Sequence, residues 1–555
     1  MNTFDYIIAG AGSAGCILAA RLSESGRHSV LLLEAGGKDS SPWFKLPVGF
    51  AKLYYNPTFN WMYYSQPQAE LAGRSLYAPR GKVQGGSGSI NAMIYVRGQA
   101  HDFDDWAASG AEGWSFKDVL PYFRKLESHP AGDSEYHGAK GPIGITPMKG
   151  QAHPICDVFL DACDQLGYPR SEDFNGEHFE GAGIYDVNVR NGQRSSSSIA
   201  YLHPALGRPN LSIEHHALVE KVLFEGERAV GVRISQNGVL RQFHARREVI
   251  LAAGAVDTPK ILQLSGVGDP VLLKQHGIPL HHHLPAVGKN LQDHLCVSYY
   301  YEASIPTLND VFGSLFGKLK LGLQYLLTRK GPLSLSVNQS GGFFRSDDQQ
   351  QHPNLQLYFN PLSYQIPKSN KATLKPEPYS GFLLCFNPCR PTSRGEIRIA
   401  SSDPKVPALI DPNYLSTQKD IDEAIQGSRL IRRIMQAPAL QSITMREVLP
   451  GPVVEDDSSM LQYFRENCGS IYHLCGSCAM GADSRTSVVD SRLQVHGLHG
   501  LRIVDASIFP NVTSGNTNAA VMMVAEKGAD LILMDAESLS TTSAGTPALR
   551  KEHIA

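Results

Sequence analysis

Three glycines near the start of the sequence have the spacing of a phosphate-binding turn. Gly10, Gly12 and Gly15 follow a strand-like segment, residues 5–9, and lead into a helical pattern. In such a turn the first glycine permits the tight bend, the second lets backbone approach a pyrophosphate, and the third lets the helix pack on the strand. The helix N-terminus adds free N–H groups and a positive dipole for the phosphates. The spacing therefore predicts a dinucleotide site.

Glu34 supports this prediction because it ends a second strand-like segment, residues 30–33, and follows Gly15 by 19 residues. An acid at that place can bind ribose hydroxyls, and it disfavours a nucleotide that carries a 2′-phosphate. Ala19 and Gly26 extend the helix-packing pattern. The extended pattern resembles the long fingerprint of FAD-binding enzymes rather than that of NAD enzymes.

Two more glycine-rich segments follow. Residues 85–89 form a small-residue loop that would let backbone lie against a flat ligand, although the same composition suits any tight loop. Residues 247–268 predict a strand, a turn at Gly254 and a helix that stops at Ser265 and Gly266. This stretch is typical of another strand–turn–helix unit of the same dinucleotide domain.

Together, these segments resemble the glucose–methanol–choline (GMC) family of FAD oxidoreductases. The resemblance covers residues 4–535, and the most similar branch holds bacterial choline-dehydrogenase-like and long-chain or aromatic alcohol dehydrogenases. Gln84 differs from the first family signature, where an aliphatic residue is usual. The segments that carry the resemblance are 81–98, 254–268, 287–294, 393–395 and 501–507.

The resemblance also implies a set of contacts to FAD. The implied cofactor-binding residues are Gly10, Gly12, Ser13, Ala14, Gly15, Glu34, Ala35, Arg80, Gly81, Gly85, Gly86, Ser87, Asn91, Ala92, Met93, Val219, Ala253, Gly254, Asp505, Ala506, Asn516 and Thr517. Members with covalent flavin place a histidine directly before the signature asparagine, whereas this chain has Ile90 before Asn91. Non-covalent FAD is therefore implied, since isoleucine offers no nucleophile.

His473 and Asn516 are the implied catalytic residues. From the residues alone, His473 lies among small and apolar neighbours and would be a satisfied core histidine, while Asn516 precedes an apolar helix as a cap would. In the family pattern, such a histidine acts as general base on the substrate hydroxyl and such an asparagine orients that hydroxyl, as hydride passes to flavin N5. Leu474 and Ala479 stand where the family commonly has proline and a basic residue.

Two other clusters suggest metal binding. Cys475 and Cys478 form a CxxC next to His473, but a structural zinc site needs four ligands and the sequence has no second CxxC. Residues 281–283 are three consecutive histidines, whose side chains would alternate between the faces of a strand and so would not share one ion. We therefore expect no metal site.

Composition restricts the partners. The 555 residues carry 51 Lys and Arg against 53 Asp and Glu, a net charge of −2, which argues against a nucleic-acid partner. Nine cysteines are too few for a disulfide scaffold. The sequence shows neither a secretory-signal pattern at its start nor an apolar run of about 18 residues. These features predict a cytoplasmic enzyme with a small-molecule partner.

Residues 310–328 carry Leu, Phe and Val at helical spacing, with Lys318 and Lys320 between them. The favoured interpretation is a helix packed on the body of the protein. The alternative is a surface helix lying in a membrane interface, which would add peripheral contact with the inner membrane face.

The expected fold is α/β, with a Rossmann-like FAD-binding domain and an antiparallel-sheet substrate domain. Residues 1–155, 205–298 and 462–536 would form the first domain, residues 156–204 and 299–461 the second, and residues 537–555 a disordered tail. The active site would lie between the domains in a largely apolar pocket.

The expected reaction is FAD-dependent oxidation of an aliphatic or aromatic primary alcohol to the aldehyde, with electrons passed to a quinone or other acceptor. Three alternatives stay open: an oxidase of the same family that uses O₂, a choline dehydrogenase, and a lyase or light-driven decarboxylase built on the FAD fold.

Overall fold

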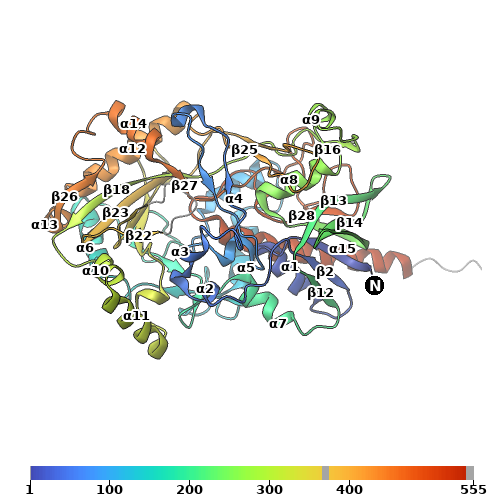
Figure 1. Cartoon of the computed structure of the whole chain (residues 1–555), viewed down its shortest axis with the longest axis horizontal. Coiled ribbons are helices and arrows are strands. Elements are labelled where there is room, and N and C mark those ends of the chain that lie inside the picture. The colour runs from blue at the N-terminus through green and yellow to red at the C-terminus, as the bar shows by residue number, and fades with distance from the viewer. Residues whose placement is uncertain (1, 366–373, 545–555) are drawn as a thin grey trace, which may run out of the picture.

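Two large sheets form the framework of the computed structural model, which describes residues 2–365 and 374–544 (Figure 1). In the first sheet, the strands before each glycine turn run parallel and share one carboxyl edge. Its strand order is β12 (Leu211–Glu214), β2 (Val30–Leu33), β1 (Thr3–Ala9), β15 (Val239–Leu251), β14 (Arg228–Gln236) and β13 (Ala217–Glu225), with β28 (Leu501–Ile503) also paired to β15.

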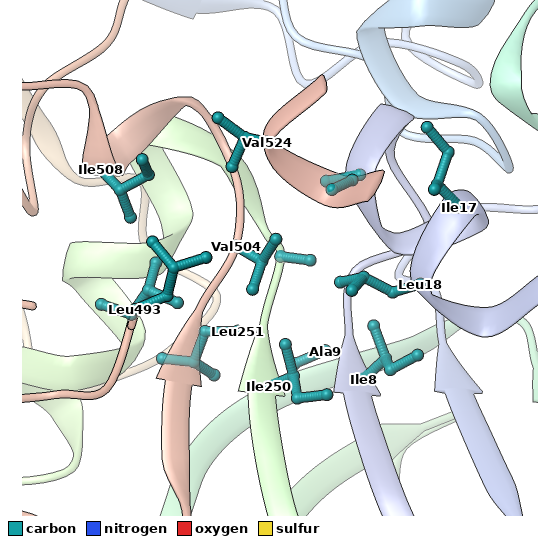
Figure 2. Packing of buried hydrophobic residues seen from close by; sticks show 14 of the residues in the cluster. Ile8, Ala9, Ile17, Leu18, Ile250, Leu251, Leu493, Val504, Ile508 and Val524 are labelled. Carbon is teal, nitrogen blue, oxygen red and sulfur yellow. The ribbon is translucent and has the colours of Figure 1, made fainter. Parts of the chain in front are cut away.

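Helices α1 (Ser13–Ser23) and α15 (Thr517–Ala544) pack against each other beside this sheet, and α5 (Phe116–Leu126) packs on α15. Apolar side chains from segments far apart in the sequence interdigitate there: Figure 2 shows Ile8 of β1 and Leu18 of α1 beside Ile250 of β15 and Val504. This core joins the start, middle and end of the chain into one unit.

The second sheet is antiparallel. Its order is β26 (Thr444–Leu449), β18 (Leu295–Ala303), β23 (Gly381–Pro388), β20 (Leu355–Asn360), β19 (Ser340–Phe344) and β8 (Gly181–Ile184), and β27 (Gly469–Ser470) extends β18. One face of this sheet is covered by α6 (Ile155–Gln165), α12 (Gln418–Met435), α13 (Pro438–Ile443) and α14 (Asp457–Asn467).

Successive side chains of β18 point alternately to the two faces of the second sheet. Val297 and Tyr299 pack into the core under the helices, whereas Ser298 and Tyr300 line a cavity on the opposite face. Successive side chains of a strand point to opposite faces, so one strand both stabilises the domain and shapes the cavity.

The remaining helices and short strand pairs connect these layers. They are α2 (Pro42–Lys45), α3 (Phe50–Leu53), α4 (Ala100–Ala108), α7 (His203–Ala205), α8 (Gly254–Leu264), α9 (Pro270–Gln275), β3 (Tyr63–Tyr64) with β4 (Tyr77–Ala78), β5 (Glu127–Ser128) with β6 (Ile143–Gly144), β7 (Thr146–Pro147) with β9 (Asp186–Val187), β10 (Val189–Arg190) with β11 (Gln193–Arg194), β16 (Val267–Gly268) with β17 (His282–His283), β21 (Tyr364–Gln365) with β22 (Lys375–Pro376), and β24 (Glu396–Arg398) with β25 (Leu409–Asp411).

The predicted fold class is confirmed: a Rossmann-like layer carries an antiparallel-sheet partner. The boundaries drawn between the two domains stay a prediction. At the C-terminal end, α15 continues to Ala544, so residues 537–544 are helical where a disordered tail was expected. The rest of that expected tail, residues 545–555, lies outside the described residues.

In the structure, the segment 310–328 differs from the predicted helix in two ways. It is split into α10 (Leu308–Gly313) and α11 (Leu315–Thr328) at Ser314, whose hydroxyl accepts a hydrogen bond from the backbone N–H of Gly317 (2.9 Å). The favoured interpretation, a helix packed through its apolar residues, is wrong for α11, because most of its leucines face solvent. Within residues 2–365 and 374–544, no helix is long and apolar enough to cross a membrane.

Candidate active site

A cavity of about 1230 Å³ lies between the carboxyl edge of the first sheet and the open face of the second. Its first wall includes Ala9, Glu34, Ala253 and Asp505, each at or just beyond a parallel strand end. Ligands of open α/β sheets bind at this edge. Because small-molecule pockets usually measure about 300–1,000 Å³, the cavity has room for a large cofactor together with a substrate.

Glycines let the backbone close tightly around this wall. Gly10 has φ +107°, and a Cβ there would lie 2.5 Å from the Ala252 carbonyl oxygen. A Cβ on Gly86 would lie 2.7 Å from the Cα of Gly12, so the two glycine loops touch through bare backbone. The N-terminus of α1 is thereby left open to the cavity, which fits the pyrophosphate of FAD.

Glu34 lines the cavity and also holds the glycine turn. Its carboxylate accepts hydrogen bonds from the backbone N–H groups of Ala11 (3.0 Å) and Gly36 (2.7 Å). Burial raises the pKa of this carboxyl, although the two N–H groups oppose the rise. The acid thus orders the turn in addition to its predicted ribose contact.

All the positions predicted to contact FAD line the cavity except Gly15 and Gly85. These two glycines shape the backbone behind the wall. A Cβ on Gly15 would meet the Gly10 carbonyl oxygen at 1.9 Å, and a Cβ on Gly85 would meet the Ser89 hydroxyl at 2.0 Å. Gly15 therefore serves the helix-packing role that its spacing predicts, and the FAD contacts themselves stay predictions.

His473 and Asn516 meet on the cavity wall although 43 residues separate them: Asn516 Nδ2 lies 3.3 Å from His473 Nε2. The preceding residue, Tyr472, has φ +73°, a left-handed conformation that is costly for a bulky side chain. Two hydrogen bonds hold this turn, from Tyr472 N to the Ser470 hydroxyl (2.8 Å) and from His473 N to the Asp293 carboxylate (2.7 Å). The backbone therefore fixes where the imidazole points.

A second histidine determines the tautomer of His473. Burial lowers the pKa of His294, so its ring is neutral at pH 7, and its Nε2 donates to the Cys389 carbonyl (2.8 Å), which can only accept. His294 Nδ1 is then the acceptor for His473 Nδ1–H at 2.9 Å. It follows that His473 carries its lone pair on Nε2, the nitrogen that faces Asn516.

The surroundings of His473 keep it uncharged. Burial lowers its pKa well below the usual histidine value, and the neighbouring His294 and Arg80 lower it further. Arg80 is itself anchored, because its guanidinium donates to the Tyr472 carbonyl (2.6 Å). A neutral imidazole with its lone pair on Nε2 can accept a proton from a hydroxyl that takes the place of the Asn516 amide contact.

Aromatic rings form much of the remaining wall. Tyr472 makes edge contacts with Tyr54 (5.6 Å between ring centroids) and Tyr77 (6.4 Å). This part of the wall is thus built from aromatic rings, most of which also carry a hydroxyl group. The aromatic residues that line the cavity are Phe50, Tyr54, Tyr55, Trp61, Tyr64, Tyr77, Tyr300, Tyr358, Tyr364, Tyr463 and Tyr472.

The two motifs that suggested metal binding do not line the cavity. Cys475 and Cys478 are buried in the hydrophobic core, and burial raises the pKa of both thiols. His282 and His283 form the short strand β17, paired with β16. Among the residues that the structure describes, no group of three or more His, Cys, Asp or Glu side chains is placed to hold a metal ion.

Comparison with known proteins identifies the family of the chain. Family models described as GMC oxidoreductase match residues 4–296 and 391–525, which together span more than half of the chain. The chain belongs to the GMC oxidoreductase family. The predicted family, the enzyme class acting on CH–OH donors and the FAD cofactor are thereby confirmed.

Other proteins of the GMC family align with nearly the whole chain. An alcohol dehydrogenase [acceptor] of Pseudomonas putida is 43% identical over 97% of this chain and 97% of its own length. An oxygen-dependent choline dehydrogenase of Photobacterium profundum is 42% identical over 96% of this chain and 93% of its own length. The solved structure of pyridoxine 4-oxidase from "Mesorbium loti" superposes with a TM-score of 0.86 at 31% identity, covering 95% of this chain and 98% of the other. At the family level, the reaction is FAD-dependent oxidation of alcohols.

Sequence reasoning missed His294 and Asp293 as parts of the site. Both lie in the segment 287–294, which resembled the family but had no function attached to it. The contact between His294 and His473 spans 179 residues, so no local spacing could reveal it. The family-like motif was the only available signal.

Proposed function

We propose that this enzyme oxidises a primary alcohol, aliphatic or aromatic, to the aldehyde. The observation that carries the proposal is the His473–Asn516 pair, whose Nε2 lone pair faces the cavity because His294 fixes the tautomer. His473 Nε2 receives the hydroxyl proton, and Asn516 orients the hydroxyl and stabilises the alkoxide that develops.

FAD, when bound, supplies the acceptor for the hydride that leaves the alcohol carbon. The glycine loops at Gly10–Gly12 and Gly85–Gly86 would hold its phosphates, and Glu34 its ribose. Ile90 stands before Asn91 and offers no nucleophile, which supports the proposal that FAD is held without a covalent bond. The aromatic wall excludes water from the reacting atoms and favours an apolar substrate.

The proposed electron acceptor is a quinone or another carrier. Quinones are lipid-soluble, so this part of the proposal includes peripheral contact with the inner face of a membrane. The name of the Pseudomonas putida relative, an alcohol dehydrogenase [acceptor], supports an acceptor that is separate from the enzyme.

Choline oxidation is a second candidate, favoured by one observation. Tyrosine rings on several sides of the cavity can hold a quaternary ammonium group through cation–π contacts, and Glu466 also lines the cavity. The choline dehydrogenases among the relatives point the same way. Lys375, which also lines the cavity, opposes it, because a second cation there repels choline.

The test is anaerobic mixing of the holoenzyme with a panel of alcohols that includes choline, followed by flavin absorbance. We expect bleaching by aliphatic or aromatic primary alcohols. His473→Ala should slow that bleaching by roughly 10²-fold or more, since general-base catalysis contributes about 10²–10⁴-fold. FAD should remain bound in the variant, which its absorbance spectrum reports. Normal bleaching in the variant would remove His473 from the mechanism.

The same panel separates the alternatives. Fastest bleaching by choline would replace the first proposal with the second. Rapid reoxidation by air with release of peroxide would identify an O₂-using oxidase. If no alcohol bleached the flavin, the result would favour a lyase or light-driven decarboxylase. The names of the relatives, which are dehydrogenases and an oxidase, oppose that hypothesis.

A further inference from the structure

Helix α11 presents its most apolar side to solvent. Only Gly317, Leu321 and Tyr325 of this helix are buried. The outward-facing residues, which we call the α11 face, are between 60% and 80% exposed, and they are Leu315, Phe316, Leu319, Leu323, Leu326 and Leu327. Figure 1 shows α11 projecting from the edge of the molecule, away from both large sheets.

The α11 face is continuous and lies opposite the buried side. At about 100° per residue, its six side chains fall within an arc of roughly 120° centred about 180° from the buried residues. A surface helix ordinarily turns its apolar stripe to the core and its polar side to water. Here the protein leaves exposed the stripe that an ordinary soluble helix would bury.

Positive charge surrounds this face. Lys318 and Lys320 are exposed and flank the apolar arc on its two sides, and Arg329 and Lys330 are exposed at its C-terminal end. Residues 311–346 contain no Asp or Glu. Long basic side chains beside an apolar stripe can lay their stems on it and extend their charges to an anionic surface.

From this arrangement we propose that the α11 face docks on an anionic lipid bilayer. The leucines and Phe316 enter the interface between headgroups and acyl chains, and the flanking lysines contact the headgroup charges. The alternative occupant is a second copy of this chain. A twofold contact through α11 would bring the same lysines of both copies close together, so the charge pattern favours lipid.

This docking also brings the lipid close to the active-site cavity. The chain runs from α11 through a short helical turn, Pro332–Ser334, to Val337 and Asn338, which line the cavity. Helix α10 contacts β22, which carries the exposed, cavity-lining Lys375. The inference rests on the proposed membrane contact and names its surface, from which the chain leads to residues that line the cavity.

The test is cosedimentation of the holoenzyme with vesicles of phosphatidylcholine alone or mixed with phosphatidylglycerol. We expect binding to the mixed vesicles, and L319E/L323E should lower the partition coefficient roughly tenfold or more. K318Q/K320Q should lower it roughly tenfold on mixed vesicles only. The matched control is Val453→Glu, since Val453 is an aliphatic residue, 83% exposed, outside α11, and this change should leave binding unaltered.

Two results would overturn the proposal: no binding of the wild type to mixed vesicles, or equal binding of wild type and L319E/L323E. A wild-type mass twice that of L319E/L323E in solution would assign the face to a second copy instead. Flavin reduction by alcohol, measured without vesicles, should be the same in all these variants. If no alcohol reduces the flavin but vesicle binding follows the pattern above, the proposed alcohol oxidation is wrong and the proposed docking surface is still supported.

Discussion

At the residue scale, the proposed role of His473 depends on a buried neighbour, His294, which does not line the cavity. His294 Nε2–H donates to the Cys389 carbonyl, so His294 Nδ1 must accept from His473 Nδ1–H. The lone pair of His473 is therefore on Nε2, the nitrogen nearest Asn516. This makes His294 a positioning residue, whose loss should change the pH dependence of the reaction as well as its rate.

The first prediction concerns the acid limb of the reaction. Because burial, His294 and Arg80 lower the pKa of His473, the wild-type rate of flavin reduction should stay constant as pH falls through about 6.5, the ordinary histidine value. His294→Leu should slow the reaction and move its acid limb to higher pH, since it removes the fixed acceptor and one source of the lowered pKa. Stopped-flow reduction between pH 5 and pH 9 measures both effects.

His294→Gln is the matched control, because an amide can accept from His473 and donate to the Cys389 carbonyl as the imidazole does. It should restore most of the rate lost in His294→Leu. A purely structural role for His294 would lower the amount of folded holoenzyme and leave the acid limb where it was.

His473 itself shows what a sequence can and cannot reveal at this scale. From its neighbours alone it would be an ordinary core histidine, and only the family resemblance pairs it with Asn516. The pairing with His294 depends on where β18 begins and where the turn around Tyr472 lies. Those positions are set by tertiary packing, so spacing along the chain does not encode them.

At the element scale, the start of helix α4 holds the loop that carries Asn516. The carboxylate of Asp102 accepts from the backbone N–H of Gln99 (2.9 Å), and also from the N–H (2.7 Å) and hydroxyl (3.0 Å) of Ser514. Burial raises the pKa of Asp102 to about 6, although the charge of Arg390 and these donors oppose the rise. One capping residue therefore ties a helix to the active-site loop.

Asp102→Ala should damage both stability and reaction. Leaving the buried N–H groups without their acceptor should cost about 1–3 kcal/mol of unfolding free energy. Flavin reduction should slow because Asn516 lies two residues beyond Ser514. Denaturant unfolding and stopped-flow reduction provide the two measurements.

Asp118→Ala provides the comparison, because Asp118 closes the capping box of α5 with Ser115, away from the cavity. It should cost about 1 kcal/mol, as lost caps do, with the rate of flavin reduction unchanged. Equal effects of the two changes on that rate would contradict a specific link between Asp102 and the Asn516 loop.

The elements differ in how well the sequence predicts them. The unit β1–α1–β2 was predictable because glycine spacing, strand pattern and terminal acid are all local signals. Helix α11 was predictable as a helix, but its orientation was not. Apolar periodicity predicts which residues share a face, whereas the structure decides whether that face meets protein or solvent.

At the scale of the whole molecule, averages hide local features. The net charge of −2 correctly describes a nearly neutral chain, yet residues 311–346 hold only basic charges. The two-sheet architecture followed from the family resemblance rather than from composition. Contacts that join distant segments, such as the buried Arg97–Glu127 ion pair at 2.7 Å, carry no signal in composition or periodicity.

The Arg97–Glu127 pair belongs to a buried cluster that should make the stability of the whole protein depend on pH. His137 Nδ1 contacts Glu127 and its Nε2 contacts Asp173, both at 2.7 Å, and the His129 ring stacks on it at 4.0 Å. Burial opposes a charge on His137, but the hydrogen bonds to Asp173 and Glu127 outweigh it and raise the pKa to about 9. His137 is therefore charged in the folded protein at neutral pH.

A histidine whose pKa is raised by folding contributes stability that is complete below its unfolded pKa of about 6.5 and lost as pH rises through about 9. The melting temperature of the holoenzyme should therefore fall between pH 6.5 and pH 9.5, by an amount on the order of a few degrees. His137→Gln should remove most of that fall, and His178→Gln, which alters a side chain that is 84% exposed, should leave it unchanged. Calorimetry of the three proteins across this range makes the comparison. Parallel slopes for wild type and His137→Gln would show that other groups control the alkaline limb.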